Sequence, residues 1–406
     1  MASNVLTPST TYSNARSAMA AGFLGWTFDA FDFFVLALVI PQVAKDFGRS
    51  IPAITATTMA TLATRPIGAF IFGLLADRRG RRPVLIANIA FYSAMEVLSG
   101  LAPNYTIFLI TRLLYGIGMG GNWGVGASLV LESVPPKWRG VASGLLQQGY
   151  ALGYLLAAGA LYVIYPRWGW RAMFFAGVIP AALTILICTR VQESEVWHES
   201  RTSWAAYKGA IFGNMRLFLY LVVLMSMMNF ISHGTQDMYP TYLQRQLHYN
   251  VGATSLVTAI SMLGAIFGGL VIGYWSDRIG RRRSMITAAL GAVCVIPLWV
   301  FAPNQALVMA GAFLMQFMVQ GAWGVIPAHI NELSPPQVRG FFPGFAYQTG
   351  VLIASSIGYI ESLLGEHFSY AAAMGGLAAA VFVIGSIVIW AGPEAKGVSF
   401  AKGATH

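Results

Sequence analysis

Charged side chains are scarce in this sequence. Lysine, arginine, aspartate and glutamate together make up 10% of its 406 residues, whereas apolar residues make up 56%. An ordinary soluble domain carries about 25% charged residues, so a water-soluble globular protein is excluded for most of the chain. The mean hydropathy of +0.63 instead indicates a polypeptide that lies largely within lipid.

Cysteine and the usual cofactor motifs are scarce or missing too. The two cysteines, Cys188 and Cys294, stand inside apolar runs and indicate neither a disulfide nor a metal site. No glycine-rich phosphate loop and no His-Glu-x-x-His motif occurs, and the 44 glycines suit close helix packing in lipid. We therefore expect no enzyme, no metal and no organic cofactor. An intramembrane enzyme built on His233 and Asp237 would lack a third metal ligand.

Long apolar runs dominate what is present. A helix needs about 20 apolar residues to cross a bilayer, and the sequence predicts twelve spans, near 17–43, 53–76, 83–101, 104–131, 139–164, 170–190, 214–243, 253–276, 283–301, 304–332, 339–363 and 370–392. The fold class is therefore an all-α membrane protein. We expect a polar tail at 1–16, a six-helix bundle at 17–190, a linker at 191–213, a second bundle at 214–392 and a tail at 393–406.

The basic residues predict the orientation of these spans. If both termini lie inside, the outer loops hold only Lys45, Arg49, Arg167, Arg171 and Arg245, and the other span ends and tails hold most of the lysines and arginines. That asymmetry predicts an inner (plasma) membrane protein with both termini in the cytoplasm. The net charge of +10 lies in short loops rather than on one face, which argues against nucleic acid as a partner.

The sequence repeats itself at an offset of 200 residues. The block Gly73-Leu-Leu-Ala-Asp-Arg-Arg-Gly-Arg-Arg82 returns as Gly273-Tyr-Trp-Ser-Asp-Arg-Ile-Gly-Arg-Arg282, and the block from Gly121 to Gly140 returns at 321–340. Two copies of one hydrophobic unit predict two bundles that rock about a shared centre, which is the design of a transporter.

The repeat separates two kinds of charged residue. Residues that serve the rocking motion should occur in both halves, and the matched ones all fall at cytoplasmic span ends: Asp77, Arg78, Arg82, Glu132 and Arg139 in the first half, and Asp277, Arg278, Arg282, Glu332 and Arg339 in the second. We expect them to pair when the inner side is shut and to separate when it opens. Simple topogenic charge is the alternative for the arginines.

Residues that handle the ligand should occur once. The ionisable residues within spans that have no ionisable counterpart are Asp29, Asp32, Arg65, Glu96, Arg112, His233, Asp237, His329 and Glu361. A charge at mid-bilayer costs about 2.5–3.5 kcal/mol on insertion scales, so such residues are functional candidates. We expect Glu96 and Glu361 to reach the membrane interface, His329 to be structural, and Arg112 either to relay charge or to support a bundle contact.

Arg65 is the candidate anion clamp. It precedes Pro66, which distorts the second span and would aim the guanidinium into a cavity. Its fork can hold a carboxylate through two hydrogen bonds. A structural pair with Asp29 or Asp32 is the alternative, and both aspartates are also candidates for proton coupling.

The seventh span carries the densest polar run. Asn229, His233, Gln236 and Asp237 fall on one helical face, and His233 and Asp237 stand one turn apart, where an imidazole and a carboxylate can share a proton. A plain helix–helix hydrogen bond is the alternative for the histidine. Gln348 in the eleventh span is a further neutral donor for the substrate.

These motifs resemble a known family. The Asp77 block and its copy are similar to the loop signature of the major facilitator superfamily. The run from Asn229 to Thr241 resembles the motif N-x-x-[S/T]-H-x-[S/T]-Q-D-x-x-x-T of the Jen lactate–proton symporters, which group with sialic acid–proton symporters. The resemblance implies roles for Arg65, His233 and Asp237 in substrate and proton binding. Tyr347-Gln348 also resembles that group, but Val351 replaces its asparagine.

Together these features predict symport of a short monocarboxylate, such as lactate or pyruvate, with a proton by rocker-switch alternating access. Sialic acid or an aromatic acid is the alternative substrate. The alternative function is that of a receptor, which binds its ligand without transporting it. A neutral-sugar facilitator would not need Arg65. We expect the protein to act as a monomer.

Overall fold

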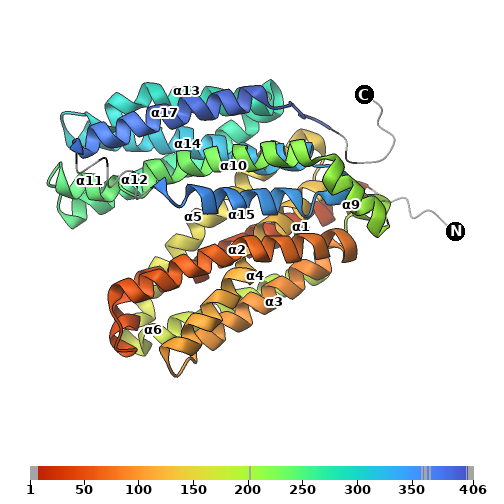
Figure 1. The fold of residues 1–406 in the computed structure, drawn as a ribbon, viewed down its shortest axis with the longest axis horizontal. Helices are drawn as coiled ribbons and strands as arrows, with labels where there is room; N and C mark the ends of the chain where they lie inside the picture. Colours follow the sequence, from red (N-terminus) through yellow and green to blue (C-terminus); the bar gives the residue numbers. More distant parts are fainter. Residues whose placement is uncertain are drawn as a thin grey trace.

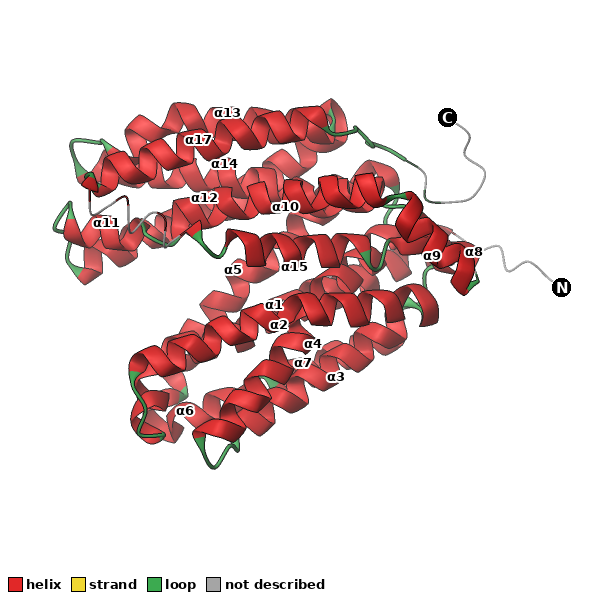
Figure 2. Ribbon diagram, in the orientation of Figure 1, coloured by secondary structure: helices red, strands yellow, loops and turns green. Residues whose placement is uncertain are grey.

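The computed structural model describes residues 8–200, 203–357, 360, 364, 367–398 and 400, and helices dominate this part of the chain (Figure 2). The first half consists of α1 (Pro8–Asp46), α2 (Ile51–Arg79), α3 (Arg81–Gly100), α4 (Tyr105–Ser133), α5 (Arg139–Val163), α6 (Tyr165–Ala176) and α7 (Val178–Arg190). The second half consists of α10 (Met215–Gln236), α11 (Tyr239–Arg245), α12 (Val251–Ile279), α13 (Arg281–Val300), α14 (Gln305–Leu333), α15 (Phe342–Ala354) and α17 (Tyr370–Ala391).

Within the described ranges, nine segments are long and apolar enough to cross a membrane. Of the remaining three predicted spans, two coincide with α4 and α5, and the third, 339–363, contains the shorter α15. Several boundaries differ from those expected. Helix α1 begins at Pro8, so residues 8–16 are helical rather than a tail, and the linker contains α8 (Glu195–Ser200) and α9 (Trp204–Gly213). Glu361 lies outside the described residues.

The two halves begin and end their helices with the same local signals. Asn104 caps α4 by accepting a hydrogen bond from the backbone N–H of Ile107, and Asn304 caps α14 in the same way. Gly80 and Gly280 separate α2 from α3 and α12 from α13 with φ of 112° and 104°. Glycine is favoured in this left-handed region because it has no Cβ. The repeat in the sequence is therefore a repeat in local structure.

The halves form two bundles that meet at one end and diverge at the other. In Figure 1 the red-to-yellow helices α1–α6 lie below the green-to-blue helices α10–α17, and the linker helix α9 lies at the end where they meet. Helix α5 packs against α12 and α14 across the seam, and α15 packs against α2 and α4. The repeated loop blocks of both halves lie at this closed end.

Two glycines allow the closed end to form. A Cβ on Gly124 of α4 would lie 2.5 Å from the Cα of Gly344 of α15, so the two helices touch backbone to backbone across the seam. We expect Gly124→Ala to open this end, because relieving such overpacking in place costs about 1–3 kcal/mol. Spin labels at Lys137 and Gln337 would report longer distances in the variant. Gly159→Ala is the matched control, since its Cβ meets nothing within 4 Å; equal distributions in both variants would contradict the expectation.

Candidate transport site

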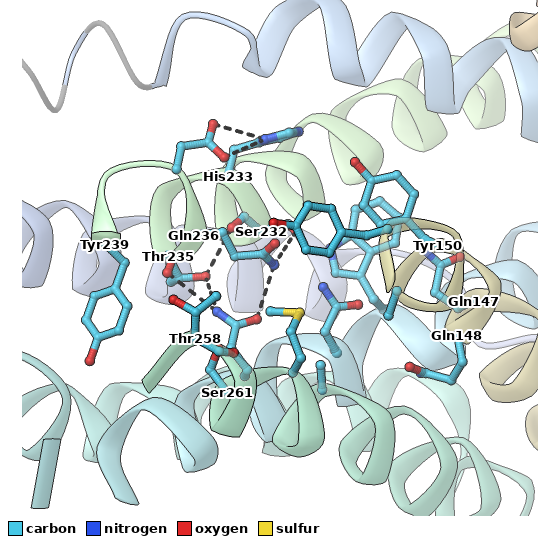
Figure 3. Close-up of a pocket in the computed structure, with 18 of the residues that line it drawn as sticks. Gln147, Gln148, Tyr150, Ser232, His233, Thr235, Gln236, Tyr239, Thr258 and Ser261 are labelled. Carbon is cyan, nitrogen blue, oxygen red and sulfur yellow. Dashed lines mark hydrogen bonds and ion pairs between the residues drawn. The ribbon is translucent and has the colours of Figure 1, made fainter. Parts of the chain in front are cut away.

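A cavity of about 280 Å³ lies between the bundles and is lined by residues of α1 and α5 from the first half and of α10–α15 from the second. In Figure 3, Gln147, Gln148 and Tyr150 of α5 face Ser232 and Gln236 of α10 across this space. The cavity therefore takes its wall from both halves of the repeat, as a transporter that rocks about its ligand requires.

Aromatic rings form much of this wall. They come from both bundles and comprise Trp26, Phe34, Tyr150, Tyr154, Tyr239, Trp299, Trp323 and Tyr347. Tyr347 is the central one, because its ring lies 6.4 Å from that of Trp26 and 5.9 Å from that of Trp323, both edge to face. The ring faces left free can stack on a flat ligand.

The His233–Asp237 pair predicted from the seventh span is present. The imidazole Nδ1 lies 3.2 Å from a carboxylate oxygen of Asp237, and the two side chains are 38% and 45% exposed. Both line the cavity. Helix α10 ends at Gln236, and Pro240 lies near the start of α11, where a missing N–H is tolerated. The pair therefore stands at a helix break with access to water.

The amides of this span form a separate network that the sequence reasoning missed in part. Gln236 donates to the hydroxyl of Ser232 and to Gln316 of α14, both at 3.1 Å. Gln316 in turn donates to the hydroxyl of Thr235 at 3.3 Å. Gln316 is absent from the predicted site, whose amides were Asn229, Gln236 and Gln348. Its position in the first repeat is glycine, so comparing the amides of the two repeats distinguishes it.

Asn229 lines the cavity as expected, but Arg65 and Gln348 do not. Arg65 is only 5% exposed and its Cζ lies 5.9 Å from the ring centre of Tyr347, which does line it. Its Nε and Nη2 atoms are buried without a hydrogen-bond partner among the described residues. Gln348 is also buried, and its amide lies 3.4 Å from the carbonyl of Gly120. The expected clamp thus lies beside the cavity, with two donors unused.

A second charged cluster is buried within the first bundle. Asp29 and Asp32 of α1 are 0% and 1% exposed, and none of their four carboxylate oxygens has a hydrogen-bond partner in the described part of the chain. Neither forms there the ion pair with Arg65 that was the alternative to the anion clamp. Glu96 of α3 pairs with Arg112 of α4, and both are buried. The prediction that Glu96 reaches the interface is therefore wrong, because Arg112 offers it a partner inside the bundle.

At the closed end, two matched carboxylates cross the seam. Asp77 of α2 accepts hydrogen bonds from the backbone N–H groups of Gly340 and Phe341 at 2.7 and 3.1 Å. Asp277 of α12 accepts from Gly140 and Val141 at 2.9 and 3.3 Å. Each carboxylate thus holds the start of a helix in the opposite bundle. Negative charge is favourable at a helix N-terminus.

The linker supports one of these carboxylates. The hydroxyl of Tyr207 in α9 donates to Asp77 at 3.1 Å. Burial, and then the charge of Asp77, raise the pKa of this tyrosine, so it stays a donor at neutral pH. The predicted linker therefore takes part in the closed end instead of only joining the bundles.

Matched glutamates lie between arginines of both bundles. Glu132 is 3.2 Å from Arg81 of its own bundle and 3.7 Å from Arg339 of the other. In the second repeat, Glu332 is 2.9 Å from Arg281 and 3.8 Å from Arg139 across the seam. Arg81 and Arg281 are fully buried but were missing from the sequence-derived set, although the repeat matches them. They hold the glutamates from within each bundle.

The other predicted gate arginines serve different contacts. Arg82 donates to the carbonyls of Cys188 and Thr189 in its own bundle, and Arg282 donates to the carbonyl of Ile389 in its own. Both hold the end of the last helix of their bundle through its carbonyls, which corrects the expectation that they pair with charged residues. Arg78 lies over the ring of Trp204 in α9, and Arg278 lies over Tyr274 of its own helix.

The comparison with known families agrees with this architecture. The family model described as Major Facilitator Superfamily matches residues 22–255 and 230–404. The chain belongs to the major facilitator superfamily. A solved structure of the proton:xylose symporter XylE superimposes on it with a TM-score of 0.76 at 20% identity, covering 96% of this chain and 98% of that one. The all-α fold predicted from the sequence is confirmed.

Several similar proteins in this superfamily carry organic acids in their names. The probable 4-methylmuconolactone transporter of Cupriavidus pinatubonensis is 30% identical over 93% of this chain and 90% of its own length. The carboxylic acid transporter protein homolog of Saccharomyces cerevisiae is 27% identical over 92% of this chain and 67% of its own length. The sialic acid transporter NanX of Escherichia coli is 29% identical over 82% and 84%. This major facilitator protein is thus a multi-pass membrane transporter and not an enzyme.

Proposed function

We propose that this transporter carries an organic carboxylate together with a proton by alternating access. The observation that carries the proposal is a central cavity, lined by the partly exposed His233 and Asp237, that adjoins the buried guanidinium of Arg65 with two unused donors. A buried cation with unsatisfied N–H groups is costly unless an anion visits it. We propose that the substrate carboxylate is that anion.

The surrounding side chains support binding of the rest of the ligand. Gln147, Gln148 and Asn229 line the cavity and offer amide groups near the carboxylate path. Tyr347 links the cavity to Arg65, because its ring contacts the guanidinium and also lines the cavity wall. A small movement of this ring would let the anion reach the fork of Arg65, which can hold it through two parallel bonds.

Electrostatics supports coupling to a proton. A carrier loaded with the anion alone would hold one more negative charge in a buried site while the bundles rock. An uncompensated buried charge raises the free-energy barrier to that conformational change. A proton on the His233–Asp237 pair, or on Asp29 or Asp32, would cancel the charge. No cofactor other than this proton is needed. The matched contacts at the closed end would form the inner gate, with the predicted cytoplasmic ends shut and the outer side open.

Two substrate classes have support. The aromatic wall favours a flat unsaturated or ring-bearing acid, and the relatives named for 4-methylmuconolactone, cis,cis-muconate and niacin are consistent with this. A short monocarboxylate such as lactate or pyruvate is supported by the seventh-span motif and by the yeast carboxylic acid homolog. The cavity of about 280 Å³ leaves lactate few contacts, so we favour the flat acids. Sialic acid, the substrate in the name of NanX, is the third candidate.

Uptake into proteoliposomes tests the proposal. Labelled cis,cis-muconate, nicotinate, lactate and sialic acid would be offered with the outside either at the internal pH or one unit more acidic. One proton per monoanion predicts accumulation up to about tenfold per pH unit, since one unit corresponds to a tenfold ratio. A protonophore should abolish it. Uptake that ignores the gradient would remove proton coupling, and uptake of none of these acids would remove the carboxylate assignment.

A further inference from the structure

The segment that follows α17 does not stay on the second bundle. Glu394 first anchors it there by accepting hydrogen bonds from the backbone N–H groups of Arg281 and Arg282 at the start of α13. The segment then reaches Phe400, which is only 5% exposed although it lies beyond the last helix. A large apolar side chain beyond the end of the last helix is buried only if other parts of the chain form a docking site for it.

That site is a pair of arginines from opposite bundles. The guanidinium carbon of Arg139, which begins α5, lies 3.4 Å from the centre of the Phe400 ring, and that of Arg339, just before α15, lies 3.8 Å from it. Arg139 also donates to the backbone carbonyl of Val398 at 2.6 Å. Guanidinium groups over an aromatic ring within 6 Å are attracted to its face. The ring therefore bridges the seam.

Apolar contacts from the same three parts of the chain surround the ring. Phe400 belongs to a buried cluster with Ala127, Val130, Leu131, Ala142 and Leu146 of the first bundle, Val196 of the linker and Ala328 of the second bundle. The site is thus composite. Neither bundle alone supplies both arginines or the whole apolar lining.

Each of the two arginines donates to backbone carbonyls, Arg139 to Leu131 and Arg339 to Asn331 and Ser334, but their approach to the glutamates is loose. Arg139 and Arg339 stand 3.8 and 3.7 Å from Glu332 and Glu132, beyond good hydrogen-bond distance. The Nη1 atom of Arg339 has no hydrogen-bond partner within the described residues. The ring of Phe400 offers both cations a favourable surface between them.

We propose that Val398 and Phe400 form an intramolecular latch that binds the cytoplasmic seam and holds the inner gate shut. When the bundles rock to open this side, Arg139 and Arg339 separate and the composite site is lost. A segment that binds one state only shifts the population toward that state. The latch rests on the alternating access proposed above but not on the substrate or on proton coupling.

Distance measurement between spin labels tests the latch without any substrate. Labels at Lys137 and its repeat position Gln337 would flank the seam, in a background with the exposed Cys294 replaced by serine. In lipid nanodiscs we expect Phe400→Ala to raise the ratio of open to shut inner gates by about tenfold, within the range typical of coupling between sites. Phe400→Tyr keeps the ring face and should match the parent protein.

Val398→Ala is the matched control, because the bond from Arg139 goes to the backbone carbonyl, which alanine retains. Its distance distribution should equal that of the parent. Distributions that coincide for the parent and Phe400→Ala would overturn the latch, as would an equal shift in Phe400→Ala and Val398→Ala. Since no transported ligand is present, failure here leaves the proposed substrate and proton coupling untouched, and failure of the uptake experiment leaves the latch untouched.

Discussion

Replacing Arg65 with alanine is expected to lower the initial rate of carboxylate uptake by about 100-fold or more. The guanidinium has two buried donors without partners, and a hydrogen bond to a charged group contributes about 1.5–3 kcal/mol. Losing two of them corresponds to a factor of about 10² or greater. The measurement is uptake of the best acid from the proteoliposome screen at a concentration well below saturation.

Arg65→Lys is the control for charge without the fork. Lysine keeps the cation but offers a single point of contact, so uptake should fall between that of the parent and that of the alanine variant. Thermal unfolding of all three proteins in detergent would show whether the fold tolerates the change. A folded Arg65→Ala protein with full uptake would remove the anion clamp from the mechanism.

The architecture was predictable because the repeat acts at every level of the structure. Matched asparagines cap matched helices, and matched aspartates hold helix starts of the opposite bundle. The composition then forces these helices into lipid. The spacing of the apolar runs did not predict where each helix begins and ends. The break at residues 237–238 and the helical start at Pro8 depend on local turn and packing choices that apolar windows do not resolve.

The site was predictable only along single helices. His233 and Asp237 are neighbours by helical spacing alone, and the structure places them 3.2 Å apart. Contacts between helices were not foreseen, because one sequence gives no register between spans. Glu96 therefore seemed free to reach the interface although Arg112 holds it.

The gate shows the same limit. Four arginines follow Asp77 in its loop block, and the repeat retains all but Arg79. Sequence alone could not tell that Arg81 turns inward to Glu132 whereas Arg82 turns to carbonyls of α7. Adjacent residues on a helix point in directions about 100° apart, so one faces the seam and its neighbour does not. The contacts of Phe400 could not be predicted for another reason, because this residue lies outside every predicted span.

Replacing Asp237 with asparagine is expected to uncouple uptake from the proton gradient. The amide keeps the size of the side chain but cannot carry the negative charge that His233 faces at 3.2 Å. Accumulation should fall from about tenfold per pH unit to no net accumulation, because the gradient would no longer do work on the anion. Exchange of labelled for unlabelled substrate across the membrane should persist, since Arg65 and the aromatic wall remain.

The buried aspartates supply the matched comparison for this result. Asp29→Asn changes a carboxylate that has no hydrogen-bond partner among the described residues and no contact with the cavity. If Asp237→Asn abolishes accumulation and Asp29→Asn does not, the transported proton resides on the exposed pair. The reverse result would place it in the first bundle, near Glu96 and Arg112. Full accumulation in both variants would contradict the assignment of the proton to either carboxylate. Each carboxylate would then be dispensable for the coupling of anion uptake to the proton gradient.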